Sequence, residues 1–165
     1  MKKQFKQKAK VGVAGLFQNQ MMGNNSTLPE VGKGATQLHY SDRSCYEVIE
    51  VSEDFKTVKL ECLDAEWDRT KANGQGHQNW ILKPTGQYIT VVWKWGAWRI
   101  KGQKIMFTEQ YAEKLGSKFY GSEDYEKCHA GGKLIVVEGI TELVTEYNKI
   151  SLLFGVKDYH YDWEF

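Results

Sequence analysis

Three carboxylates stand at alternate positions near the middle of the chain and could together hold a metal ion. Asp64, Glu66 and Asp68 share one face of an extended strand if that strand continues through Trp67. Carboxylate oxygens are the ligands that Mg²⁺ and Ca²⁺ prefer. The glycine and distal glutamate of a calcium-binding loop are absent, so a solvated strand edge is the simpler interpretation. We therefore expect that the protein binds no metal and no cofactor. An alternative is a metal-dependent enzyme acting on nucleotides or nucleic acid, in which these three carboxylates would be the metal ligands.

A tryptophan-rich hairpin holds the densest group of side chains suited to binding. A strong strand pattern over residues 88–95 folds back at Trp95-Gly96-Ala97-Trp98, which brings rings and cations together. Such rings can stack nucleic-acid bases while the charges follow phosphates, and they equally suit a protein interface. Packing in the core of a small β domain is the competing interpretation. The candidate binding residues are Trp93, Lys94, Trp95, Trp98, Arg99 and Lys101.

The remaining nucleophiles and soft metal ligands are scattered. Cys45, Cys62 and Cys128 are odd in number and widely spaced, which predicts neither a disulfide framework nor a zinc knuckle. This cysteine usage indicates a reducing compartment, the cytoplasm. The glycine-containing residues 31–36 lack the order of a phosphate-binding loop, and no nucleophile elbow occurs. The sequence therefore predicts a protein that is not an enzyme.

Positive charge is concentrated in the first ten residues. They carry five lysines and no acid, a charge of +5, whereas the rest of the chain has 17 basic and 21 acidic residues, a charge of -4. Residues 1–30 are polar and poor in β-branched side chains, which predicts an arm that does not fold alone. Two interpretations of this segment are possible: a solvated leader, or an arm that docks on a partner or on nucleic-acid phosphates. The lysines are Lys2, Lys3, Lys6, Lys8 and Lys10.

Length and composition indicate one globular domain, which follows the arm in the sequence and contains the other candidate residues. The chain has 165 residues, of which 41% are hydrophobic and 26% charged, and its net charge is +1. No apolar run is long enough for a membrane-spanning helix or a secretory signal, so we expect no membrane contact. The small net charge excludes a generally basic nucleic-acid coat. We expect a single β-rich domain over residues 31–165.

Short β-rich runs separated by Gly, Asp and Asn predict antiparallel strands over most of this domain. The expected strands are 35–40, 45–52, 57–63, 78–83, 88–95, 98–101 and 105–107. A turn at Pro84-Thr85-Gly86 is expected between the fourth and the fifth. The pattern predicts a mainly β fold, a small antiparallel barrel or SH3-like sheet.

The sequence periodicity changes after residue 107. Residues 108–119 repeat large side chains every four positions behind Thr108, which predicts a capped helix, and residues 122–128 predict a second short helix. Residues 133–138 predict a strand. Residues 140–147 fit either a helical stripe or a strand, and their length favours the strand. The aromatic residues 159–165 should pack against the rest of the domain, because leaving several rings exposed would lose the stabilising free energy of burying them.

Several motifs occur together in the β-rich part of the chain. They are Val31-Gly32-Lys33-Gly34-Ala35-Thr36, Tyr40-Ser41-Asp42-Arg43, Val48-Ile49-Glu50-Val51, Asp64, Asn73-Gly74 with Gln78, Trp98 near Lys101-Gly102, and the ending 155–165. In these motifs the chain resembles a family of small bacteriophage and prophage proteins with no established activity.

The resemblance covers residues 31–107 and 150–165 and leaves 108–149 as an insertion. It implies a viral origin and supplies no catalytic residues. The matched polar residues Asp42, Arg43, Asp64 and Gln78 are expected to pin turns by bonding to backbone groups. Asp42 and Arg43 are also candidate binding residues.

The expected function is therefore non-catalytic binding. The resemblance favours a phage accessory protein that engages a host protein or nucleic acid in the host cytoplasm, for host takeover or counter-defence. A virion-associated structural protein with a docking arm is the first alternative, and the metal-dependent enzyme is the second. Self-association into a homo-oligomer is left open.

Overall fold

The computed structural model describes residues 27–73, 78–115 and 123–161. The chain divides into two compact units. Of the described residues, the first unit takes in 27–73, 78–101 and 148–161, and the second takes in 102–115 and 123–147. The residue range of the second unit nearly coincides with that of the expected insertion, 108–149. In the described residues, seven strands form one antiparallel sheet in the order β8-β5-β4-β3-β2-β1-β9.

These strands confirm the prediction of a mainly β fold. The sheet order is open in the described residues, with β8 and β9 at its edges. The strands of the sheet are β1 (Gly34–Leu38), β2 (Arg43–Val51), β3 (Thr57–Trp67), β4 (Trp80–Lys94), β5 (Ala97–Phe107), β8 (Thr141–Lys149) and β9 (Leu152–Phe154).

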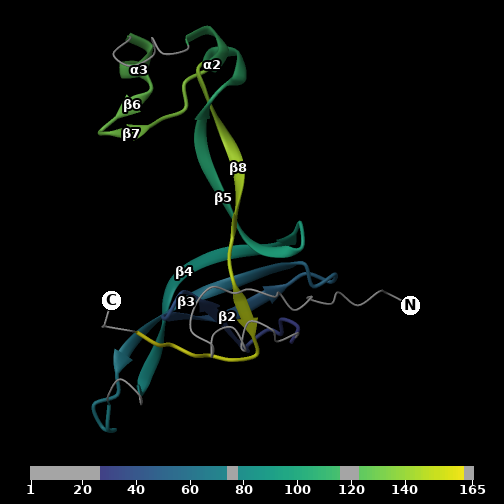
Figure 1. Cartoon of the computed structure of the whole chain (residues 1–165), viewed down its shortest axis with the longest axis vertical. Coiled ribbons are helices and arrows are strands. Elements are labelled where there is room, and N and C mark those ends of the chain that lie inside the picture. Colours follow the sequence, from purple (N-terminus) through teal and green to yellow (C-terminus); the bar gives the residue numbers. More distant parts are fainter. Residues whose placement is uncertain (1–26, 74–77, 116–122, 162–165) are drawn as a thin grey trace. The chain divides into compact units, whose positions relative to one another are not determined.

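Strands β2, β3 and β4 lie side by side as a meander (Figure 1). The turn between β2 and β3 is built from its own polar side chains. The Ser52 hydroxyl donates to a carboxylate oxygen of Asp54 at 2.7 Å and accepts from the Thr57 amide at 2.9 Å. Such local bonds compete with continued strand pairing and so favour a reversal at this point.

Strand β4 corrects one expectation, because the predicted turn at Pro84-Thr85-Gly86 is wrong. The strand continues through these residues with a bulge, since Glu61 pairs with Tyr88 and Leu63 pairs with Pro84. The Thr85 hydroxyl donates to the Cys62 carbonyl at 2.8 Å, and Gly86 adopts a φ of 73°. Turn-forming residues whose polar groups are satisfied by the neighbouring strand make a bulge rather than a reversal.

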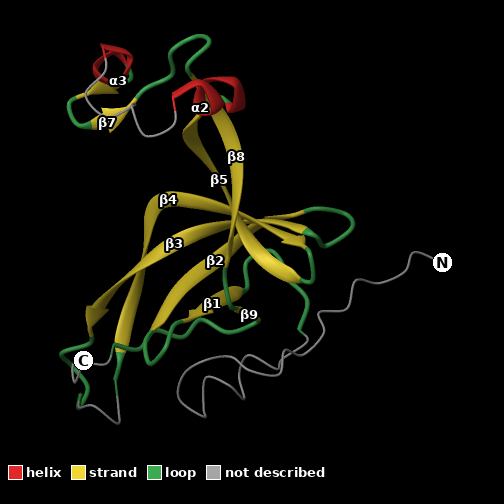
Figure 2. Ribbon diagram, turned by 45° about the horizontal axis from the view of Figure 1, so that its top comes forward, coloured by secondary structure: helices red, strands yellow, loops and turns green. Residues whose placement is uncertain are grey.

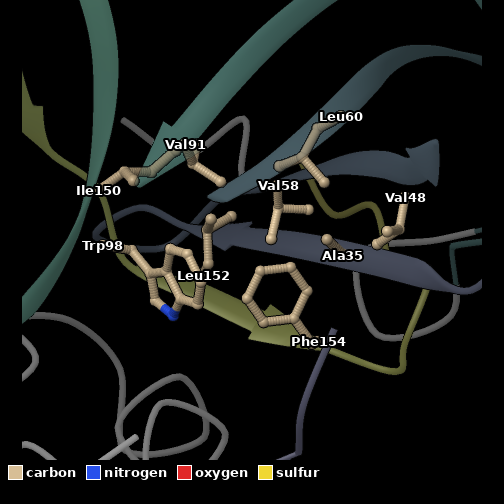
Figure 3. Packing of buried hydrophobic residues seen from close by; sticks show 9 residues of the cluster. All are labelled: Ala35, Val48, Val58, Leu60, Val91, Trp98, Ile150, Leu152 and Phe154. Atoms are coloured by element: carbon tan, nitrogen blue, oxygen red, sulfur yellow. The ribbon is translucent and has the colours of Figure 1, made fainter. Parts of the chain in front are cut away.

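The core of the first unit gathers inward side chains from β1 to β5 and from the segment that ends in β9 (Figure 3). The Trp98 and Phe154 rings pack edge to face at 5.1 Å between centroids. Buried aromatic rings of this kind contribute more stability than any other side chains. The core residues are Ala35, Val48, Val58, Leu60, Val91, Trp98, Ile150, Leu152 and Phe154.

The segment from Ile150 to β9 connects two parts of the first unit. The Ile150 amide donates to the Trp98 carbonyl at 3.0 Å, and the Leu38 amide donates to the Ser151 carbonyl at 2.9 Å. Strand β9 then pairs with β1, as Figure 2 shows. One short segment therefore bonds to β5 at its start and to β1 along the rest of its length.

In the second unit, the two predicted short helices are confirmed where they are described. These are α2 (Glu109–Leu115) and α3 (Glu123–Lys127), and residues 116–122 lie outside the described residues. Thr108 is the N-cap residue of α2, as predicted, because its backbone carbonyl accepts the first bond of the helix, from the Ala112 amide at 2.9 Å. Its hydroxyl donates to the Gly139 carbonyl at 3.4 Å.

The strand interpretation of residues 140–147 is also confirmed, as β8. The strand predicted over 133–138 is shorter than expected, because a hairpin of β6 (His129–Ala130) and β7 (Lys133–Leu134) ends there. The buried Thr141 hydroxyl donates to the Ile135 carbonyl and accepts from the Val137 amide, both at 2.7 Å. These bonds satisfy the backbone between β7 and β8 without a strand partner.

The stability of the first unit is expected to fall in alkali because of Cys45. Burial raises the pKa of this thiol from 9.0 to about 11. The unfolded chain therefore loses the thiol proton first, so the stabilisation is complete below pH 9.0 and is lost as the pH rises toward 11. We expect the free energy of unfolding in urea to be about 1 kcal/mol lower at about pH 10 than at about pH 8. Cys45→Ala should flatten this difference, and an unchanged difference would contradict the assignment.

Candidate functional site

The tip of the β4–β5 hairpin carries a strained and exposed tryptophan. Trp95 and Gly96 form a two-residue turn between Lys94 and Ala97, which pair with each other. Their φ angles are 52° and 70°, the pattern of a type I′ turn. A bulky side chain at positive φ costs on the order of 1–3 kcal/mol, and Asn-Gly is the usual choice here. Trp95 is nevertheless 68% exposed, so its ring does not recover this cost by burial.

Two cations lie against the Trp95 ring. The Lys94 ammonium is 4.8 Å from the ring centroid, and the Arg99 guanidinium carbon is 4.9 Å from it. The Arg99 Nε also donates to the Lys94 carbonyl at 3.2 Å, which holds the guanidinium beside the turn. The tip thus presents an aromatic ring whose neighbours are positively charged.

The other two tryptophans of the hairpin face the core. Trp98 is 2% exposed, and Trp93 is half-buried and packs on Trp98 at 5.5 Å between centroids. The strand pattern over 88–95 predicted an extended Trp95, but β4 ends at Lys94 and the turn carries Trp95 outward. Trp98 therefore acts in packing and does not offer a surface for binding in this conformation.

Two further residues that the sequence did not single out lie on the side of β3 and β4 that points away from the core. The Lys59 ammonium is 4.7 Å from the centroid of the Tyr88 ring, and Tyr88 is 51% exposed. Lys59 lies on β3 opposite Thr90. Strand alternation could have placed Tyr88 outward, but only the register between β3 and β4 brings Lys59 to it.

Asp42 and Arg43 line a second site, a pocket of about 430 Å³ that includes none of the hairpin residues. The Arg43 guanidinium pairs with the Asp158 carboxylate. Burial raises the pKa of the Tyr159 phenol in this pocket, and the Asp42 carboxylate raises it further. The pocket residues are His39, Tyr40, Ser41, Asp42, Arg43, Ser44, Tyr159, His160 and Tyr161.

Two of the matched polar residues hold the segment that follows β9. Arg43 bonds to His160 through both backbone groups, at 2.8 and 3.2 Å. The Gln78 side-chain amide donates to the Tyr161 carbonyl at 2.7 Å and accepts from the Tyr161 amide at 3.0 Å. Tyr159 also packs edge to face on Trp80. The expected packing of the aromatic terminus is confirmed for Tyr159 and His160, which are half-buried, whereas the Tyr161 ring is exposed although its backbone is held. Residues 162–165 lie outside the described residues.

The three carboxylates at alternate positions are not brought together as a ligand set. The Glu66 carboxylate pairs with Lys83 at 2.5 Å. The Asp68 carboxylate accepts from the Thr70 hydroxyl and amide, and these hydrogen bonds lower its pKa. Within the described residues, no group of three or more His, Cys, Asp or Glu side chains could hold a metal ion.

The remaining candidate residues are the exposed Lys101, on β5, and the lysines of the arm. Lys2, Lys3, Lys6, Lys8 and Lys10 all lie outside the described residues. No helix in the described part of the chain is long and apolar enough to cross a membrane. Comparisons of the chain with protein-family models, with curated proteins and with solved structures gave no match.

Proposed function

We propose that this chain is a non-catalytic binding protein that engages its partner through the tip of the β4–β5 hairpin. The single observation that carries the proposal is Trp95, a strained residue that is 68% exposed. The resemblance to phage proteins supports an accessory role in the host cytoplasm, with a host protein or nucleic acid as partner.

The energetics of the turn support a functional role for Trp95. Asn at this position would adopt positive φ at lower cost, so folding alone does not account for a tryptophan there. Strained residues that gain nothing from burial concentrate at functional sites. Tryptophan and arginine are also enriched among residues that dominate binding energy. Trp95 with Lys94 and Arg99 therefore forms the proposed contact.

We also propose that the first unit is barrel-like, because a barrel would hold the tip of the hairpin rigidly. The support is the segment from Ile150 to β9, which bonds to β5 at Trp98 and to β1 at Leu38. A sheet whose first and fifth strands are joined through one segment has fewer exposed edges. Such a scaffold limits the entropy lost when the hairpin binds.

The test of the proposed function is Trp95→Asn. We expect a midpoint of thermal unfolding roughly 2–4 °C higher, because about 1 kcal/mol of backbone strain is relieved. Capture of partners from bacterial lysate, with and without nuclease treatment, should be lost at the same time. Val31→Asn alters another exposed apolar side chain, outside both the hairpin and the pocket, and should leave capture unchanged. Retained capture by a stabilised Trp95→Asn protein would refute the proposal.

A further inference from the structure

We propose, on the basis of the proposed function above, that the partner is single-stranded nucleic acid. It would lie across the outward faces of β3, β4 and β5. In this arrangement Tyr88 and Trp95 stack on bases, and the surrounding Lys and Arg side chains contact phosphates.

The alternation of β4 defines this outward face. Ile89, Val91 and Trp93 pack against the core, so the residues between them point to the opposite side. The register extends the face across the neighbouring strands, because Thr90 lies opposite Lys59 and Val92 lies opposite Arg99. We call this surface the outer face; its residues are Lys59, Glu61, Tyr88, Thr90, Val92, Lys94, Arg99 and Lys101, with Trp95 at its end.

Two exposed rings stand on the outer face, and each has a cation close to it. Tyr88 is 51% exposed with Lys59 at 4.7 Å, and Trp95 is 68% exposed with Lys94 and Arg99 within 5 Å. Six steps of extended strand from Tyr88 to Lys94 span roughly 20 Å, and Trp95 follows in the turn. That distance fits the footprint of about 4–16 nucleotides that one small β-barrel domain covers on a single strand.

The charge of the outer face favours phosphate. Among the residues named above, four cations accompany one carboxylate, Glu61, which accepts a hydrogen bond from the Gly86 amide at 3.1 Å. Beyond the edge of this face, on β2, Glu50 lies opposite Lys59. Protein interfaces are depleted in lysine and surround a buried aromatic with apolar neighbours. Here each ring has a lysine or arginine within 5 Å of its centroid, and the carboxylate residue Glu61 also lies opposite Tyr88. Rings interleaved with cations are typical of surfaces that bind single-stranded nucleic acid.

The rings also favour single strands over duplex. An aromatic face can stack on a base only where the base is unstacked from its neighbours, as in single strands and loops. The outer face consists of strands, and in the described residues of the first unit there is no helix to enter a major groove. Duplex should therefore bind only through the salt-sensitive attraction of phosphates.

The test is fluorescence anisotropy with the full chain and a labelled oligothymidine of about 12 nucleotides, compared with a duplex of equal length. We expect tighter binding of the single strand. Trp95→Asn and Tyr88→Ser should each weaken it by on the order of 10-fold. Lys59→Gln and Arg99→Gln should each lower the slope of log affinity against log salt by about 1. Val31→Asn and Lys71→Gln are the matched controls and should bind normally.

The outcomes separate this inference from the proposed function. If no oligonucleotide binds, or if Trp95→Asn and Tyr88→Ser bind the single strand as well as the unaltered chain does, the inference is overturned. If Trp95→Asn then still abolishes capture of a nuclease-resistant partner, the proposed function survives and that partner is a protein. If Trp95→Asn changes neither oligonucleotide binding nor capture, both proposals fail. Thermal unfolding of each variant confirms that a loss of binding is not a loss of fold.

Discussion

Trp98→Ala is expected to lower the free energy of unfolding by about 3–5 kcal/mol. The indole is 2% exposed and contacts Phe154 and Trp93 edge to face, at 5.1 and 5.5 Å between centroids. Removing it leaves a cavity where β4, β5 and β9 meet, and close-packed surroundings collapse only partly around such a cavity. The Ile150 amide bonds to the Trp98 carbonyl, so the cavity also lies beside the segment that leads to β9.

The measurement is urea unfolding followed by circular dichroism, with Trp95→Ala as the matched control. The two tryptophans are three residues apart in one hairpin, yet Trp95 is 68% exposed. Its replacement should change stability by no more than about 0.5 kcal/mol. Equal losses in the two variants would show that the hairpin does not divide its tryptophans between core and surface.

Gly34→Ala is expected to destabilise the first unit by about 3 kcal/mol and to displace the segment after β9. A Cβ atom on Gly34 would lie 2.5 Å from both the Lys157 nitrogen and the Val156 carbonyl carbon. These are backbone atoms, so relief requires the chain itself to move. The Gly34 carbonyl also accepts from the Gly155 amide at 2.9 Å, which holds the two backbones together next to the contact.

Two readouts test the Gly34 prediction. Urea unfolding gives the loss of stability, and limited proteolysis reports whether residues 156–161 have left Arg43 and Gln78. Gly102→Ala is the matched control, because the nearest atom to its added Cβ, the Glu146 Cγ, is at an ordinary 3.5 Å. Equal stability and equal protease resistance in the two variants would contradict the close approach at Gly34.

Local patterns predicted most of the strands but not the course of β4. Strands β2 and β3 begin within two residues of their predicted starts, because alternating apolar residues mark both starts, although β2 bulges between Val48 and Glu50. Pro84-Thr85-Gly86 has turn chemistry in the sequence, and the predicted reversal was nevertheless wrong. The Thr85 hydroxyl and the Gly86 amide bond to β3, and a partner strand cannot be read from the residues of β4 alone.

The candidate site was predictable in composition and not in orientation. The sequence located rings and cations around Trp95-Gly96, and turn chemistry placed the reversal there. It did not separate the outward Trp95 from the buried Trp98, because both interpretations satisfy the same spacing. It missed Tyr88 and Lys59 because their contact depends on the pairing register of two strands.

By itself, the sequence determined the division of charge between a basic first decapeptide and an acidic remainder, the mainly β class and the position of the tryptophan hairpin. These follow from local composition and periodicity, which need no partner. Only the tertiary structure decided that Trp98 is core and Trp95 is surface, and that Arg43 and Gln78 hold the segment after β9. Those assignments depend on contacts between residues far apart in the sequence, such as Arg43 with Asp158, which are 115 positions apart. Burial is a property of the packed chain, so no window of sequence contains it.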